Sequence, residues 1–181
     1  MTIPTSSNPS VNPFDLAVPV SDRVQIKRMI LTETRASRAD EDRFKVGKFG
    51  LKYHHVVANV NLDRERAEVA VKVSFTVITV EDIDPELEPA VSIEATFVLI
   101  YSLDSIEGIE NDNLAAFGVT NAVYNAWPYW REFVQSTAVR MGLPALVVPV
   151  FRFSKPKAAE STTPKDGSVT EDSSTSSQAE P

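Results

Sequence analysis

Residues 121–153 read NAVYNAWPYWREFVQSTAVRMGLPALVVPVFRF, and this stretch decides the fold. Its apolar residues recur at spacings of three and four, which is typical of one buried face of a helix. Pro128 lies inside this pattern and is expected to kink or loosen the turn before it. Gly142 is a natural helix stop, and Pro144 prevents the helix from continuing. An apolar, proline-marked segment follows.

The sequence therefore predicts a long kinked helix that is capped by Thr120 or Asn121 and ends at Met141. Residues 111–117 fit a shorter helix before it. The expected buried stripe of the long helix consists of Val123, Trp127, Trp130, Val134, Ala138 and Met141.

Four upstream segments alternate apolar and polar residues, as strands with one buried face do. They are residues 22–34, 49–62, 67–80 and 91–103. Residues 63–66 read as a tight hairpin connection, and the acidic residues 82–89 with two prolines read as a loop. Short connections between consecutive strands favour antiparallel pairing, so we predict a four-stranded antiparallel meander. Strands followed by helices give an α+β fold.

The two ends of the chain differ in composition from its middle. Residues 1–20 contain four prolines among Ser, Thr and Asn, which predicts a flexible N-terminal arm. Residues 154–181 are acidic and rich in Ser and Thr, with almost no large apolar side chain to offset the loss of chain entropy. We therefore expect a disordered tail there and one folded domain over residues 21–153.

Charge and composition exclude several classes of protein. The chain has no cysteine, so disulfides and thiolate metal sites are excluded and a reducing cytosol is compatible. No basic start precedes an apolar run, and no apolar stretch approaches the roughly 20 residues that span a bilayer, so we expect a cytoplasmic protein without membrane insertion. The net charge is −7, and residues 73–130 contain acids but no Lys or Arg. This argues against nucleic acid as a partner and suits a partner with a basic patch, unless the acids are simply a solvated rim.

The residues do not indicate an enzyme. The two histidines, His54 and His55, are neighbours in a predicted strand, so they point to opposite faces and cannot share a metal without a bulge. No Gly-x-Ser-x-Gly turn and no phosphate-binding Gly-rich loop is present. Paired carboxylates such as Glu86 and Glu88 fall in the predicted proline-containing loop, which holds such a pair poorly. We expect no catalytic residue, no metal and no cofactor.

Three motifs carry a resemblance to a known family. They are Trp127-Pro128-Tyr129-Trp130-Arg131-Glu132, then Arg140-Met141-Gly142-Leu143-Pro144 with Leu146, then Pro149-Val150 before an aromatic. In order and spacing this combination resembles the SecB family of cytosolic secretion chaperones. The resemblance implies four antiparallel strands followed by helices, and a homotetramer built as a dimer of dimers.

The resemblance also implies a function. SecB proteins are ATP-independent holdases that keep unfolded polypeptides, including preproteins for export, in apolar surface grooves. Residues expected to line such a groove are Phe97, Tyr101, Trp127, Tyr129, Trp130, Phe133, Leu143, Leu146 and Val148. The alternative for each of them is ordinary packing in the core or between subunits.

Partners other than unfolded clients remain open. The family docks the motor ATPase SecA on an acidic sheet surface, for which Glu94 is the candidate here. The tail lacks the apolar and basic character that such docking would want, and Pro156 discourages the second helix that export members have. Some SecB-like proteins instead guard an antitoxin of a toxin–antitoxin system, so a dedicated chaperone is an alternative. A small-molecule-binding or enzymatic α+β domain is a further alternative.

Overall fold

The computed structural model describes residues 12–44, 49–81 and 88–152. The chain divides into two units, Met1–Phe151 and Arg152–Pro181, and every helix and strand described lies in the first. The predicted tail over residues 154–181 and most of the predicted loop over residues 82–89 lie outside the described residues.

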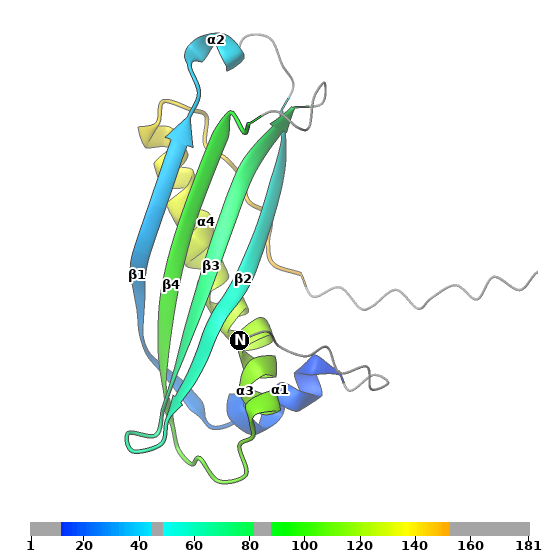
Figure 1. The fold of residues 1–181 in the computed structure, drawn as a ribbon, viewed down its shortest axis with the longest axis vertical. Helices are drawn as coiled ribbons and strands as arrows, with labels where there is room; N and C mark the ends of the chain where they lie inside the picture. Colours follow the sequence, from blue (N-terminus) through cyan, green and yellow to red (C-terminus); the bar gives the residue numbers. More distant parts are fainter. Residues whose placement is uncertain (1–11, 45–48, 82–87, 153–181) are drawn as a thin grey trace, which may run out of the picture. The chain divides into compact units, whose positions relative to one another are not determined.

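Four long strands form one antiparallel sheet (Figure 1). They are β1 (Val24–Arg38), β2 (Phe49–Asp63), β3 (Glu68–Glu81) and β4 (Val91–Leu103). The hairpin between β2 and β3 is confirmed, and Asp63 stabilises it because its Oδ1 accepts from the backbone N–H groups of Glu65 and Arg66 at 3.0 and 3.1 Å.

The predicted strand order is correct for only part of the sheet. The order is β1-β4-β3-β2, so β2, β3 and β4 form a meander, whereas β1 pairs with β4 instead of β2. The physical reason lies in the apolar residues that β4 carries on both faces, such as Leu99 beside Ile100. Such a strand is best placed in the centre of a sheet, and the edges are left to β1 and β2, whose second faces are more polar.

The prediction of a flexible arm is wrong for residues 13–20. Those residues lie in helix α1 (Pro13–Ser21), which buries Ala17 and Val20 in the core. Asn12 caps the helix by accepting the backbone N–H of Phe14 at 3.1 Å, and a proline stands at the first helical position, where its missing N–H costs nothing. Residues 1–11 lie outside the described residues.

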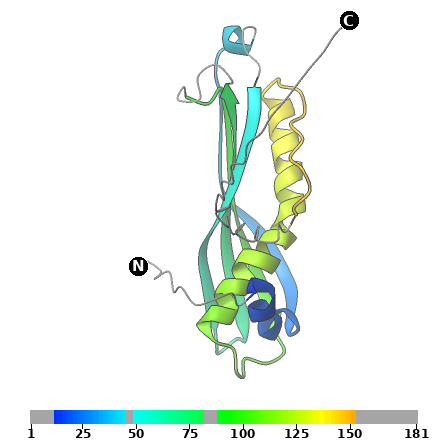
Figure 2. The same cartoon turned by 90° about the vertical axis from the view of Figure 1, so that its right-hand side faces the viewer.

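The chain after β4 is helical from residue 111 to residue 140. It comprises α3 (Asn111–Phe117), a π-helical segment η1 (Gly118–Ala122) and α4 (Val123–Arg140). The predicted helix start at Thr120 or Asn121 is wrong, because both residues lie in η1, inside the helical stretch. The Thr120 hydroxyl donates to the carbonyl of Ala116 at 2.7 Å. Figure 2 shows α3 and α4 running in different directions, with η1 between them.

The helix packs closely against the sheet at η1. A Cβ added to Gly118 would lie 2.8 Å from a Val60 methyl group and 3.2 Å from a Val57 methyl group. A glycine is therefore needed at this position of the helix, because any side chain would push it away from β2.

The core lies between one face of the sheet and the helices α1, α3 and α4 (Figures 1 and 2). The predicted helix stripe is confirmed, since its members are buried except for Met141, which is half-buried. Trp130 is fully buried and stacks on Phe75 of β3 with ring centroids 5.6 Å apart. Within the described residues, no helix has the length and apolar character needed to cross a membrane.

Candidate functional site

An apolar cavity of about 600 Å³ opens at one end of the sheet, next to the C-terminal end of α4. Three parts of the chain that are distant in sequence supply its walls: the region around the short helix α2 (Glu41–Phe44), the strand ends of β2, β3 and β4, and the segment that follows α4. The lining residues are Arg38, Glu41, Phe44, Phe49, Leu51, Thr79, Val91, Gly142, Leu143, Pro144 and Leu146.

The way α4 ends places Leu143 and Leu146 in this cavity. The N–H of Leu143 donates to the carbonyl of Ala138 and the N–H of Gly142 to that of Val139, both at 3.0 Å. This pair of bonds is a Schellman motif, and Gly142 occupies its left-handed position with a φ of 74°. The helix thus ends at Gly142, and Pro144 prevents it from resuming. Leu143 and Leu146 are half-buried against the core. We call residues 142–146 the open segment.

The next residues are held in a different way. The indole Nε1 of Trp127 donates to the carbonyl of Pro149 at 2.8 Å, and Nε of Arg131 donates to the carbonyl of Val148 at 2.7 Å. Both donors lie on one side of α4, because they are four residues apart. Phe151 packs against Trp127 with centroids 4.9 Å apart. We call residues 148–151 the anchored segment.

The structure places the nine expected groove residues in different environments. Five of them are buried within the subunit, which corrects the expectation that they face a groove; they are Phe97, Tyr101, Trp127, Trp130 and Val148. Their large rings are needed to fill the layer between α4 and the sheet. Phe133 is half-buried and stacks on Trp130 at 6.2 Å, while Tyr129 is 59 % exposed on the outer side of α4. Of the nine expected residues, Leu143 and Leu146 are the two that line the cavity.

Several cavity residues were not foreseen from the sequence. Arg38, Phe44, Phe49 and Leu51 lie about ninety residues before the motif-bearing segment. The available signal is weak: two phenylalanines, Phe44 and Phe49, flank a short basic stretch between two strands. Their rings lie 5.5 Å apart.

The titrating groups near α4 have packing roles. His55 sits among the rings of Phe75, Trp127 and Phe151, and its pKa is lowered from 6.5 because burial disfavours the charged form and because His54 adds a like charge. Burial raises the pKa of Tyr101 to about 12, against the hydrogen bond that its hydroxyl accepts from Asn125 at 3.1 Å. Within residues 12–44, 49–81 and 88–152, no group of three or more potential ligands is placed to hold a metal ion.

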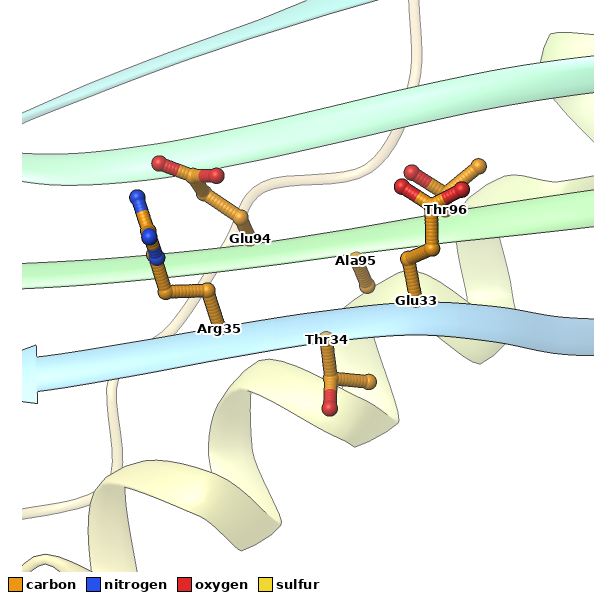
Figure 3. Close-up of a pocket in the computed structure, with 6 residues that line it drawn as sticks. All are labelled: Glu33, Thr34, Arg35, Glu94, Ala95 and Thr96. Carbon is orange, nitrogen blue, oxygen red and sulfur yellow. The ribbon is translucent and has the colours of Figure 1, made fainter.

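The face of the sheet opposite α4 is mixed, with charges of both signs beside apolar residues such as Val98 and Ile100. Glu94 of β4 is the register partner of Arg35 of β1, and Figure 3 shows their side chains on the same side of the sheet, directed toward each other, while Thr34 and Ala95 point to the other side. They line a shallow depression of about 250 Å³. On the same face Lys72 pairs with Glu33 at 2.8 Å. The acids of this surface are therefore accompanied by cations.

Comparison with known proteins shows the fold. No protein-family model matches the sequence, and no curated protein matches it. Among solved structures, the SecB-like chaperone of Mycobacterium tuberculosis, in complex with a ChAD peptide from the HigA1 antitoxin, superposes with a TM-score of 0.65. The superposition covers 78 % of this chain and 100 % of that chain, at 19 % sequence identity. The chain has a SecB-like fold.

A second structure carries no argument. It is a protein of unknown function from Streptococcus agalactiae, with a TM-score of 0.35 and 11 % identity over 70 % of this chain and 96 % of that chain. The SecB-like fold confirms the four-stranded antiparallel sheet followed by a long helix. In this structure the motif residues Trp127 and Arg131 hold the anchored segment by hydrogen bonds.

Proposed function

We propose that this protein is an ATP-independent chaperone that holds non-native polypeptide in the apolar cavity beside the open segment. The single observation that carries the proposal is the cavity itself, whose walls include Phe44, Leu51, Leu143 and Leu146 and which opens to solvent. Large aliphatic and aromatic surfaces bind apolar side chains without demanding a fixed sequence. A folded protein keeps such side chains inside, so selection for unfolded chains follows from access.

The size of the cavity fits this task. A volume of about 600 Å³ accommodates one or two large side chains of an extended peptide. Apolar burial contributes about 25 cal/mol per Å², so one inserted side chain gives a few kcal/mol before the cost of ordering the client. Binding of this strength is weak at one site and becomes useful when several copies of the site hold one long chain.

The surface of the subunit supports an oligomer. β1 is an edge of the described sheet, and its residues Ile26 and Leu31, which face the same side as α4, are 51 % and 44 % exposed. Tyr129 and Val139 are also largely exposed on the outer side of α4. Apolar residues spread in this way favour assembly of identical copies, so the proposal includes a homotetramer of the dimer-of-dimers type in the cytoplasm.

Two forms of the proposed chaperone differ in their clients. The M. tuberculosis neighbour was solved with an antitoxin peptide, and this favours a chaperone dedicated to an antitoxin as the second candidate. A role in protein export would require docking of the SecA motor, for which Glu94 is the candidate residue. The cations Arg35 and Lys72 on the same face reduce the negative potential that a basic partner would require. We therefore rank export below antitoxin protection.

An aggregation assay tests the proposal. Several unrelated proteins, diluted from denaturant, are monitored by light scattering with and without this protein and without ATP. Suppression for all of them supports a general holdase, whereas protection of one protein encoded next to this chain supports the dedicated form. If none is protected, and if a panel of small metabolites raises the melting temperature instead, the cavity belongs to a small-molecule site and the chaperone proposal is wrong.

A further inference from the structure

Two of the three walls of the cavity, the α2 region and the open segment, are joined by one side chain, that of Arg38. Arg38 is the last residue of β1 and lines the cavity. Its Nη1 donates to the carbonyl of Met141, the C-cap residue that follows α4, at 2.5 Å, and its Nε donates to the carbonyl of Ala39 at 3.3 Å. The guanidinium carbon also lies 5.3 Å from the ring centroid of Phe44 in α2. One half-buried cation therefore contacts β1, α2 and the end of α4.

Only an arginine makes these contacts at once. The guanidinium group is planar, has several donors in fixed directions, and lies flat over an aromatic ring while its edge still donates. The carbonyl of Met141 belongs to the last turn of α4, where unpaired carbonyl groups and the helix dipole favour a cation. A lysine would keep the charge and one donor but lose the contact of the guanidinium with the Phe44 ring.

The open segment is fitted closely to this guanidinium. A Cβ added to Gly142 would lie 3.2 Å from Nη1 of Arg38, which is tighter than normal van der Waals contact. A glycine at position 142 is therefore favoured for two reasons. It adopts the left-handed φ of 74° without strain, and it has no side chain to crowd Arg38. The start of the open segment is thus placed relative to β1 by contact with one side chain, in addition to its own helix-end hydrogen bonds.

We propose that Arg38 is a positioning residue that sets the spacing between the α2 wall and the open-segment wall, and hence the size of the apolar side chain that the cavity accepts. The effect on client selection rests on the function proposed above. The spacing of the walls is a property of the free protein and does not depend on it. The guanidinium contacts Phe44 of the α2 wall and, through the carbonyl of Met141, the chain that leads to Leu143 and Leu146.

The spacing is measured directly between two spin labels. The chain has no native cysteine, so Asp40→Cys, just before α2, and Ala145→Cys, in the open segment, provide two exposed attachment points. Pulsed dipolar spectroscopy is run on the full-length chain, diluted with unlabelled protein so that distances within one copy dominate. We expect a narrow distance distribution with Arg38, a broad one in Arg38→Met, and an intermediate one in Arg38→Lys. The matched control is Arg35→Met on the opposite face of the sheet, which leaves the distribution narrow.

Client selectivity is the second measurement. Two labelled Ser/Lys-rich peptides, identical except for Phe or Ala at one central position, are titrated against the same variants without spin labels. If Arg38→Met leaves about a tenth of the molecules with correctly spaced walls, the apparent Kd of the Phe peptide rises about tenfold, and its preference over the Ala peptide shrinks accordingly. A residue with a purely structural role would lower stability without changing this ratio. Cooperative unfolding of each variant in urea shows that it is folded.

The outcomes separate this inference from the proposed function. Unchanged distance distributions in Arg38→Met overturn the inference whatever the peptides do. A broad distribution combined with an unchanged Phe-to-Ala preference also overturns it, because the spacing then does not govern selection. If the protein with Arg38 binds neither peptide, the proposed function of the cavity is wrong, and the distance measurement alone decides whether Arg38 sets the spacing.

Discussion

Two consecutive pieces of chain after α4 show opposite ways of using apolar residues. The anchored segment, residues 148–151, is fixed by the indole of Trp127 and the guanidinium of Arg131, and Val148 is buried. The open segment, residues 142–146, leaves α4 through Gly142 and presents Leu143 and Leu146 to a cavity. The difference shows that the same apolar, proline-marked sequence pattern serves packing in one place and surface presentation in the next.

The largest loss of stability is expected from a substitution in the core between α4 and the sheet, next to the anchored segment. Trp130→Ala removes a fully buried indole that stacks on Phe75, so it should lower the free energy of unfolding by about 3–5 kcal/mol. Urea unfolding monitored by circular dichroism measures this. Tyr129→Ala is the matched control, because the neighbouring ring is exposed and its removal should cost little. Equal losses of unfolding free energy for the two variants would mean that Trp130 does not stabilise the core as the structure indicates.

Substitutions in the open segment should weaken client binding while costing little stability. Leu143→Ser combined with Leu146→Ser should weaken binding of an unfolded client by at least about tenfold, because each Leu contributes roughly 1.5–3 kcal/mol when it is fully buried by a ligand. The stability loss should stay well below that of Trp130→Ala, since both side chains are only half-buried. Fluorescence anisotropy with a labelled, permanently unfolded protein measures the binding.

Val139→Ser is the control for this double variant, because Val139 is an exposed apolar residue of α4 that does not line the cavity. Size-exclusion chromatography is needed beside the binding assay. If the double variant dissociates into smaller species, Leu143 and Leu146 belong to a subunit interface, and the distinction between the open and the anchored segment loses its functional meaning.

The anchored segment itself is tested by removing one donor. Trp127→Phe keeps an aromatic ring beside Phe151 but leaves the carbonyl of Pro149 without its donor, which should cost about 1 kcal/mol for the hydrogen bond. A further loss is expected from the smaller ring. Hydrogen exchange of the amides that follow Val148 should accelerate, while exchange at Gly142 and Leu143 should not change. Acceleration in both segments would show that they open as one unit.

The sequence predicted the local elements better than their arrangement. Strand alternation, the hairpin at Asp63 and the helix stop at Gly142 are local signals, and all are confirmed. The position of β1 beside β4 was missed, because pairing between strands more than fifty residues apart is not contained in their periodicity. Helix α1 was missed although Asn12 and Pro13 form a recognisable helix start, since the prolines around it suggested an extended arm.

The sequence indicated only a small part of the candidate site, since Leu143 and Leu146 are the two expected groove residues that line the cavity. Leu143 and Leu146 follow a helix stop and precede or follow a proline, which marks them as presented rather than packed. The opposite wall, with Arg38 and Phe44, comes from a different part of the chain, so no spacing rule connects it to the motif. Trp127 and Trp130 were expected in a groove because of the resemblance to SecB proteins, but the layer between the helix and the sheet needs their volume for its own packing.

The smallest expected effect is the pH dependence of stability that arises from His55, whose ring packs against Phe151 of the anchored segment. The pKa of His55 is lowered in the folded protein, first by burial among Phe75, Trp127 and Phe151 and then by the charge of His54. The unfolded chain therefore binds the proton more readily than the folded chain. Stability contributed by neutral His55 is fully present above the ordinary value of 6.5 and is lost as the pH falls from there toward the lowered pKa.

His55→Phe should remove this part of the acid sensitivity, because it keeps the ring contacts but cannot take up a proton. Unfolding free energies at about pH 7.5 and about pH 5.5, on either side of the usual histidine pKa, should differ less in His55→Phe than in the unaltered chain. His54→Gln is the control: it removes the exposed histidine on the opposite face, so most of the difference should remain. The same loss of stability at acid pH in His55→Phe and in the unaltered chain would show that carboxylates, and not His55, govern this range. The anchored segment would then be held independently of pH between these two values, as the Trp127 and Arg131 hydrogen bonds alone would predict.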